Sequence, residues 1–236
     1  MRPYVIINGK PSYTITGLLI QSLPPISKPK MRTKSEEIEG RDGDIITPLG
    51  FKAYDKTLNI GLYGDYNVDE VISYFAQSGT IRFSNEVDKY YNFAPYDQVD
   101  YNRLLNFKTA KVKLHIQPFK YDALETEQEI TNSNTKGFIV KLNNKGNYSS
   151  RPRYTVTGSG IIRFLLNGKE VLTVTMAGET FILDSTTLNA TNASGAYVNR
   201  KVVGSLEDLA LPTGENELSI RGNVTRIKIK DVSRWL

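Results

Sequence analysis

The sequence predicts a mainly β protein that is divided into two domains. Short runs rich in β-branched and aromatic residues, many alternating apolar with polar, recur from residue 4 to residue 232. Residues 124–137 are first charge-rich and then rich in Asn, Ser and Thr, which is typical of a domain boundary. We therefore expect an N-terminal domain over residues 1–130 and a C-terminal domain over residues 131–236.

The N-terminal domain begins with predicted strands at residues 4–9 and 12–20, separated by the turn formers Gly9 and Pro11. Further strands are expected at residues 56–64, 80–85, 89–96 and 104–123. Within the last strand, two lysines and His115 alternate with apolar residues. This alternation indicates one buried face and one solvated or interface face.

One segment of the N-terminal domain has helical rather than strand spacing. Apolar residues recur there at Val68, Val71, Ile72 and Phe75. Asn67 is suited to cap the first turn, which carries two acidic residues, and Gly79 is suited to end the helix. We expect one amphipathic helix at about residues 67–78, covering an open face of a small sheet or barrel.

The C-terminal domain is predicted to contain short, closely spaced strands. They are expected at residues 137–142, 153–158, 160–166, 170–176, 179–184, 196–203, 217–222 and 225–232. Asn167-Gly168 and Gly222-Asn223 are predicted to form tight hairpin turns between neighbouring strands. Many short strands with frequent turns indicate an antiparallel β-sandwich.

The composition argues against several classes of function. Apolar residues make up 39% of the chain, but no apolar run approaches about 18 residues, so we expect no membrane insertion. Cysteine is absent, which excludes disulfides and thiol chemistry and fits assembly in a reducing cytoplasm. The N-terminus is too short and too strand-like for a signal peptide.

The residues that carry common catalytic chemistry are also scarce. His115 is the single histidine, and the sequence provides no visible partners for it as a base. Residues 40–44, GRDGD, lack the later ligands of a calcium loop and are expected to form a turn. We therefore expect no catalytic residues, no cofactor and no metal site.

Two binding functions remain as alternatives. The basic run at residues 226–230, RIKIK, could contact DNA, in line with a net charge of +5. A carbohydrate-binding β-sandwich module would need an exposed aromatic platform. The candidates for a stacking patch are four tyrosines: Tyr90, Tyr91, Tyr96 and Tyr101. A galectin-type sugar site needs a His and a Trp in the strands of the sandwich, but the second domain has no His and the single Trp, Trp235, lies one residue from the C-terminus.

An unusual charged segment interrupts the N-terminal domain. Its basic row falls on every second residue: Lys28, Lys30, Arg32 and Lys34. Its acidic block follows, relieved only by Arg41: Glu36, Glu37, Glu39, Asp42 and Asp44. In a strand the basic row lies on one face and Met31 on the other.

Two interpretations of this segment stay open. It could be a hairpin whose own strands pair and leave a solvated surface. It could instead be an arm that leaves its subunit and lays its basic row on the acidic block of the next copy. Prolines at positions 24, 25 and 29 favour projection, since they stiffen the chain and cannot pair in a central strand.

The sequence resembles the distal tail (Dit) proteins of siphophages along nearly the whole chain. The resemblance is carried in the first domain by GLLIQSLPPISKPKMRTKSEEIEGRDGDI, GFKAYDKTLNIGLYG, VDEVISYFAQSGTIRFSNEVDKYYN and LLNFKTAKVKLHIQPFKY, and in the second by LPTGENELSIRG and VTRIKIKDVSRWL. It implies a β-barrel-like N-terminal domain with one helix and an extended arm, called the belt, at about residues 26–47. It also implies a galectin-like C-terminal sandwich.

The same resemblance implies a structural hub without enzymatic activity. Proteins of this family form homo-hexameric rings at the virion tail tip, around a channel through which DNA passes only transiently. The ring joins the major tail tube protein to the tail-associated lysin or tail fibre hub. Receptor-binding or other baseplate proteins attach outside, and assembly takes place in the host bacterial cytoplasm.

Overall fold

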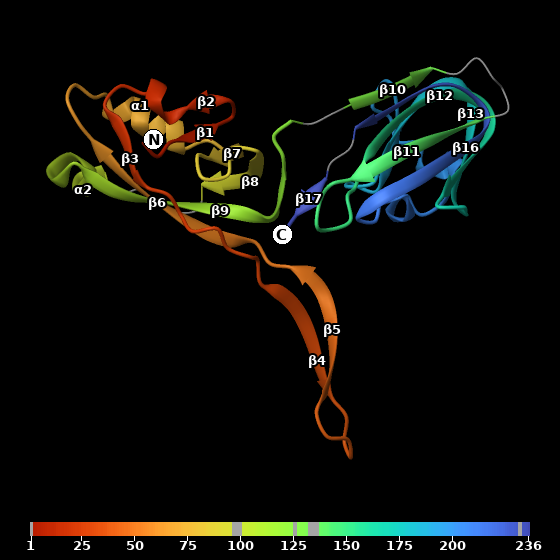
Figure 1. The fold of residues 1–236 in the computed structure, drawn as a ribbon, viewed down its shortest axis with the longest axis horizontal. Coiled ribbons are helices and arrows are strands. Elements are labelled where there is room, and N and C mark those ends of the chain that lie inside the picture. The colour runs from red at the N-terminus through yellow and green to blue at the C-terminus, as the bar shows by residue number, and fades with distance from the viewer. Residues whose placement is uncertain (1, 96–100, 125–126, 132–136, 231–232) are drawn as a thin grey trace. The chain divides into compact units, whose positions relative to one another are not determined.

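The computed structural model describes residues 2–95, 101–124, 127–131, 137–230 and 233–236, and the chain divides into two units (Figure 1). The first unit is Met1–Ala123 and the second is Leu124–Trp235. The sequence placed the division after residue 130. The observed division falls earlier because strand β10 (Glu127–Thr131) pairs with β16 (Gly214–Lys230) and so belongs to the second unit.

The first unit is built on an antiparallel sheet that curls into a half-barrel. Its strands follow the order β2-β1-β7-β8-β9-β6-β3, so β2 and β3 lie at the edges. Their bounds are β1 (Val5–Ile7), β2 (Lys10–Pro11), β3 (Leu18–Ser22), β6 (Tyr54–Leu62), β7 (Gly79–Phe83), β8 (Lys89–Pro95) and β9 (Thr109–Asp122), with the 3₁₀ turn η1 (Ser12–Thr14) between β2 and β3. One face of the sheet is apolar, and that face forms the core of the unit.

Helix α1 (Val68–Phe75) packs on this core, as the helical spacing predicted. The side chain of Asn67 accepts hydrogen bonds from the backbone N–H groups of Asp69 at 3.0 Å and Glu70 at 3.3 Å, which confirms the predicted cap. The helix ends at Phe75, with Ala76 as its C-cap, and not at Gly79. Gly79 instead begins β7, at a φ of +138° that favours glycine.

A second helix, α2 (Tyr101–Phe107), occupies residues that the sequence assigned to the start of the long strand. The prediction of a single helix and of a strand from residue 104 was therefore wrong in this stretch. Leu104 is buried in the core from a helical position, and Lys108 adopts a φ of +56°, which ends the helix before β9 begins. Within β9 the predicted alternation is confirmed, with Val112 and Leu114 buried and Lys111 exposed.

The strands of the second unit are β10, β11 (Phe138–Asn144), β12 (Arg153–Leu166), β13 (Lys169–Asp184), β14 (Asn189–Asn192), β15 (Val202–Gly204), β16 and β17 (Arg234–Trp235). Three long strands among them, β12, β13 and β16, each replace two predicted strands. Two 3₁₀ turns, η2 (Asn199–Lys201) and η3 (Leu206–Leu209), lie between β14 and β16. Residues 196–203, predicted as one strand, contain the 3₁₀ turn η2 at Asn199–Lys201, and only the last two belong to β15. The Asn199 side chain accepts a hydrogen bond from the backbone N–H of Ala190 at 2.6 Å.

Strands β12, β13 and β16 are long enough to contribute to both halves of a sandwich. One half has the order β10-β16-β12-β13-β14 and uses the ends of β16 and β13 with the start of β12. The other half has the order β11-β16-β12-β13-β15 and uses the opposite parts of the same strands. Apolar side chains from both halves form one core, including the fully buried Tyr154, Phe164 and Phe181. The predicted antiparallel sandwich is confirmed.

Bulges bend the strands where the sequence predicted breaks. Asn167 and Gly168 do form the tight turn between β12 and β13, with φ of +51° and +83°. Gly222, however, lies within β16 and makes no hairpin, so that prediction was wrong. The register between β12 and β16 shifts between Ser159 and Arg163, and Gly222 at φ +119° accommodates the irregularity.

Among the described residues, neither α-helix approaches the length and apolar character that crossing a bilayer requires.

Replacing Gly222 with alanine tests the bulge in β16. A Cβ at this position would lie 2.5 Å from the backbone oxygen of Ile161, and the positive φ adds strain. We expect Gly222→Ala to destabilise the second unit by about 1–3 kcal/mol. Gly178→Ala is the control, because Gly178 also has a positive φ, +86°, but no atom within 4 Å of the added Cβ. Equal shifts of the second unit's transition in calorimetry would contradict the steric argument.

Candidate functional site

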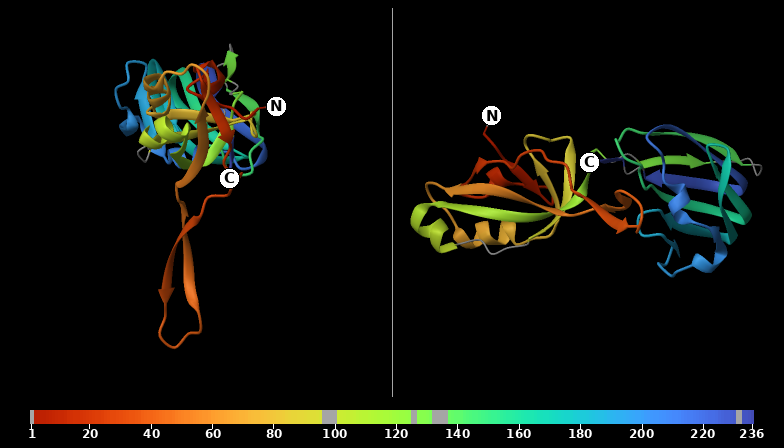
Figure 2. Two further views of the ribbon diagram at one scale, coloured as in Figure 1. Left: turned by 90° about the vertical axis from the view of Figure 1, so that its left-hand side faces the viewer. Right: turned by 90° about the horizontal axis from the view of Figure 1, so that it is seen from below.

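The unusual charged segment forms a two-stranded hairpin, the arm, made of β4 (Met31–Glu37) and β5 (Asp44–Phe51). Figures 1 and 2 show the arm projecting from the sheet of the first unit, beyond the ends of β3 and β6. Met31 pairs with Phe51, Thr33 with Pro48 and Glu37 with Asp44. The strands β4 and β5 pack chiefly against each other.

The arm extends further along the chain than the predicted residues 26–47. Strand β5 continues to Phe51 because Gly50, at φ +96°, forms a bulge that restores the pairing after Pro48. Phe51 then contacts Phe119 of β9 edge to face, with ring centroids 5.7 Å apart. The run ITPLGF, which looks like an ordinary strand of the sheet, is therefore the second strand of the arm.

Two residues of the basic row precede strand β4, and the other two lie on it. Lys28 and Lys30 lie in the extended segment before β4, and the carbonyl of Lys30 accepts a hydrogen bond from the N–H of Lys52 at 2.8 Å. Arg32 and Lys34 lie on β4 and share one face. Met31 and Ser35 alternate with them, as strand geometry predicted.

Several charges of the arm have partners within the same hairpin. Lys34 forms an ion pair with Glu36, and the hydroxyl of Ser35 donates a hydrogen bond to Asp44. The Nη2 of Arg32 donates to the carbonyl of Leu49 at 3.1 Å. All these groups are exposed, where such contacts contribute little stability. These pairs lie within the hairpin and leave most of its charge facing solvent.

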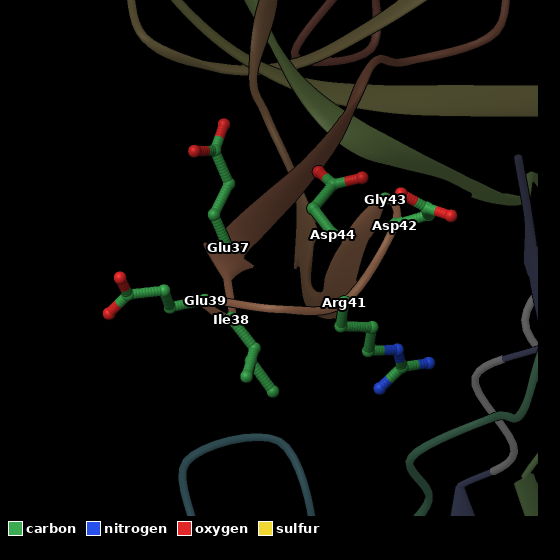
Figure 3. Close-up of a pocket in the computed structure, with 7 residues that line it drawn as sticks. All are labelled: Glu37, Ile38, Glu39, Arg41, Asp42, Gly43 and Asp44. Atoms are coloured by element: carbon green, nitrogen blue, oxygen red, sulfur yellow. The ribbon is translucent and has the colours of Figure 1, made fainter.

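The tip of the arm, residues 38–43, is acidic and open. An open hollow there is lined by Glu37, Ile38, Glu39, Arg41, Asp42, Gly43 and Asp44. Figure 3 shows these side chains pointing in different directions, so the carboxylates do not converge on one point. No group of three or more His, Asp or Glu among the described residues could hold a metal ion. The tip therefore has no geometry for binding a cation.

Exposed apolar side chains are the feature of the arm that sequence reasoning missed. Apart from Met31, which the sequence singled out, they are Ile38, Ile45, Ile46 and Leu49. Ile46 is 62% exposed and Leu49 52% exposed. Ile45 and Ile46 are consecutive, so apolar surface lies on both faces of the hairpin. Contiguous exposed apolar groups on a soluble protein mark an interaction surface.

His115 lies on the solvated side of β9 as expected. Its Nδ1 is 2.8 Å from Oδ1 of Asp55, and Nζ of Lys113 is 3.3 Å from Oδ2 of the same carboxylate. The hydrogen bond with His115 lowers the pKa of Asp55. The trio crosses two neighbouring strands, β6 and β9, and consists of a hydrogen bond and an ion pair to one partly exposed carboxylate.

The predicted aromatic patch is not assembled by the residues that the structure describes. Tyr91 is buried and its hydroxyl donates to Glu86 at 2.5 Å, while Tyr90 stacks on Tyr121 with centroids 5.4 Å apart. Tyr96 and the side chain of Tyr101 lie outside the described residues.

The sandwich has a separate groove of about 390 Å³, lined by Lys141, Leu142, Asn143, Asn167, Glu215, Asn216 and Glu217. None of these lining residues is aromatic. The side-chain amide of Asn216 donates to the carbonyls of Pro212 and Gly214, each at 2.9 Å, and Asn167 Oδ1 accepts from the N–H of Glu217 at 2.8 Å. The groove therefore offers no platform on which a sugar ring could stack.

The basic run at residues 226–230 is partly neutralised by strand β10. Nζ of Lys228 lies 2.9 Å from Glu129 and 3.3 Å from Glu127, and Arg226 lies 3.7 Å from Glu129. Hydrogen bonds to Glu129 and Glu127 raise the pKa of Lys228. The run therefore helps to dock β10 on β16 and is less available to DNA than its sequence indicated.

A curled sheet with a projecting hairpin, followed by a β-sandwich, defines the class of this chain. No protein-family model matches the sequence, and no curated protein matches it. The solved structures that are similar to this chain include two that match it over its whole length.

The first is the crystal structure of the Dit protein (gp 19.1) of phage SPP1, described as a paradigm of the hub adsorption apparatus in phages that infect Gram-positive bacteria. It is 15% identical, with a TM-score of 0.63, and the match covers 100% of both chains. The second is a chain of the phage P2 baseplate in its activated conformation with Ca, which is 11% identical with a TM-score of 0.50. That match covers 100% of this chain and 98% of the other. The resemblance to distal tail proteins is thus confirmed at the level of the fold.

The ion pairs between β10 and β16 can be tested by hydrogen exchange. We expect Lys228→Gln to raise the exchange rates of the amides in residues 127–131 roughly two- to fivefold, because the exposed pairs add modestly to docking. The pKa of Lys228 is raised in the folded chain, so its contribution is fully present below the ordinary lysine pKa and is lost only as pH rises through the raised value. Lys141→Gln, at an exposed position of β11, is the control. Unchanged exchange in Lys228→Gln would show that backbone pairing alone holds β10.

Proposed function

We propose that this chain is a structural hub of a long non-contractile phage tail, with the fold and role of a distal tail protein. The observation that carries the proposal is the arm, whose apolar side chains lie on both faces of a hairpin that its own unit does not cover. Exposing this apolar surface to water is unfavourable in free energy, and a second chain that covered it would remove the unfavourable contact with water. The fold shared with the SPP1 Dit protein over the full chain supports the same assignment.

The arm fits a ring of identical subunits. The hairpin of each copy would bind the next copy. Head-to-tail contacts of this kind form a closed ring when the rotation between neighbouring subunits divides a full turn evenly. We infer a homo-hexamer, with the basic row and the acidic block pairing between neighbours in addition to the apolar contact. The predicted interface residues are Lys28, Lys30, Met31, Arg32, Lys34, Glu36, Glu37, Glu39, Arg41, Asp42 and Asp44. We add Ile38, Ile45, Ile46 and Leu49 to this proposal because their apolar side chains are exposed on the arm.

The remaining partners follow from the same assignment. One face of the ring would stack on the major tail tube protein, and the other would receive the tail-associated lysin or tail fibre hub. Receptor-binding or other baseplate proteins would attach to the sandwich. DNA would pass through the central channel without lasting contact, and the protein would reside at the virion tail tip after assembly in the host bacterial cytoplasm. The role is structural and requires no catalysis, cofactor or metal.

The apolar surface of the arm can be tested with charged substitutions. We expect Ile46→Asp/Leu49→Asp to raise the protein concentration needed for half-maximal assembly by roughly tenfold or more, since two large apolar contacts are removed. Light scattering measures the particle mass over a concentration series, and electron microscopy identifies rings. Ile161→Asp/Val203→Asp is the matched control, because both residues are apolar and at least 59% exposed on the sandwich. The proposal fails if the two double variants assemble alike.

The ionic part of the interface needs a separate variant. We expect Lys30→Glu/Arg32→Glu/Lys34→Glu to weaken assembly at low salt, and the difference from the parent to shrink at about 0.5 M NaCl as the charges are screened. The control Lys141→Glu/Arg163→Glu/Lys169→Glu makes the same change of charge at exposed positions of the second unit. Equal assembly of the two triple variants at low salt would leave the apolar contact as the whole of the interface.

A further inference from the structure

A buried lysine lies at the root of the arm. The alternation of β6 directs Lys56, Leu58 and Ile60 to the core face of the sheet, and Lys56 is only 3% exposed. An apolar residue would be expected at such a position, because burying an ammonium group costs several kcal/mol unless it finds partners.

Aromatic rings surround the ammonium group. Its Nζ lies 5.3 Å from the ring centroid of Tyr91, 5.6 Å from that of Tyr54 and 5.8 Å from that of Phe83. These distances are within the range of cation–π attraction. Burial lowers the pKa of Lys56, and the negative charge of Glu86 opposes this shift. Glu86 itself accepts hydrogen bonds from Lys120 and Tyr91, each at 2.5 Å.

The hydrogen bond that Lys56 donates goes to the chain that leads into the arm. Its Nζ lies 2.7 Å from the carbonyl oxygen of Pro25. Other side chains hold the same exit segment, residues 22–30. They form three contacts: Asn59 Nδ2 to Ser22 Oγ at 2.5 Å, Asn85 Nδ2 to the Pro24 carbonyl at 3.5 Å, and the Tyr54 hydroxyl to the Ser27 carbonyl at 3.4 Å.

Proline explains why side chains are needed here. Backbone pairing between β3 and β6 reaches Ser22 and Asn59, and a backbone bond joins the same two segments again at Lys30 and Lys52. Between these points the exit segment contains Pro24, Pro25 and Pro29, which have no N–H to donate. The carbonyl of Pro25 is bonded instead by a side chain from β6, and that of Pro24 by Asn85 from the turn between β7 and β8. Of these contacts, the one from Lys56 is the shortest to a backbone carbonyl and starts from the most buried side chain.

We propose that Lys56 is a positioning residue that fixes the direction in which the arm leaves the first unit. Its ammonium group is surrounded by aromatic rings on the core side and bonds the exit segment in the stretch where prolines interrupt the backbone pairing. The proposal concerns the arm of a single chain. Only its consequence for assembly rests on the proposed function.

If Lys56 has this role, its replacement should affect the stability of the first unit and the order of the arm in opposite directions. Methionine has a similar length and no charge, so Lys56→Met removes the cost of burying an ammonium group and should leave the melting temperature of the first unit unchanged or higher. The same substitution removes the bond to Pro25 and should loosen the arm. A residue that served only the stability of the core would not give opposite effects.

Distance measurements between spin labels can detect the loosening. The chain contains no cysteine, so Ser73→Cys on α1 and Thr47→Cys on β5, both at exposed positions, can carry the only two labels. Double electron–electron resonance is recorded on the full chain diluted with unlabelled protein. We expect the distance distribution to become about twofold broader in Lys56→Met. It should stay narrow in Lys56→Arg, which keeps the charge and the donors.

The control is Lys111→Met, which removes the same charge from an exposed position of the neighbouring strand β9. A distribution in Lys56→Met as narrow as in the parent and in Lys111→Met would overturn the proposal. Should Lys56→Met not fold, Tyr54→Phe/Asn85→Ala removes two other bonds to the exit segment while Lys56 remains. In that case we expect a narrow distribution both in this variant and in Tyr54→Phe/Asn59→Ala/Asn85→Ala, in which the bond from Lys56 is the last of the four that remains. A distribution about twofold broader than in the parent would show that Lys56 does not hold the arm.

Light scattering on the same variants keeps this proposal distinct from the proposed function. Broad arm distances with normal assembly would support the role of Lys56 and contradict the role of the arm between subunits. Narrow distances with impaired assembly would contradict the role of Lys56 and leave the role of the arm intact.

Discussion

A hairpin of two strands cannot bury its own side chains, and the rest of this structure depends on that constraint. Strands β4 and β5 satisfy each other's backbone groups, but no second layer covers either face. Ile45, Ile46 and Leu49 therefore remain exposed in a chain whose two units each enclose an ordinary apolar core. These apolar side chains would leave water only if another chain covered the hairpin.

The first unit is organised to hold such a hairpin at a defined root. The arm continues from β3 and β6, which are paired in the sheet, and Phe51 contacts Phe119 where the arm begins. Prolines end the backbone pairing of the exit segment, and a buried Lys56 with neighbouring polar side chains replaces the missing bonds. Stiffness at the root reduces the conformational entropy that the arm would lose on binding. A rigid arm therefore binds more tightly than a flexible one with the same contacts.

The sequence allowed much of the arm to be predicted, but the exposed apolar side chains of the arm were missed. The alternating charges from Lys28 to Lys34 and the acidic residues to Asp44 indicated an unusual hairpin, and the hairpin is present. The predicted arm ended at residue 47, so Leu49 and Phe51 were left outside it, and the exposure of Ile45 and Ile46 was not predicted. Composition reports the preference of a residue for burial and does not say which surface buries it. Lys56 was missed for a related reason: a lysine in a strand normally faces water.

Local sequence determined the elements whose signals lie within a few residues. These include the Asn67 cap of α1, the Asn167-Gly168 turn and the alternation along β9. Tertiary pairing decided the others. Gly222 became a bulge within β16 because β12 runs beside it, and β10 joined the second unit because β16 provides a partner with opposite charges. A glycine permits both a turn and a bulge, so only the neighbouring strand, which is distant in sequence, can select between them.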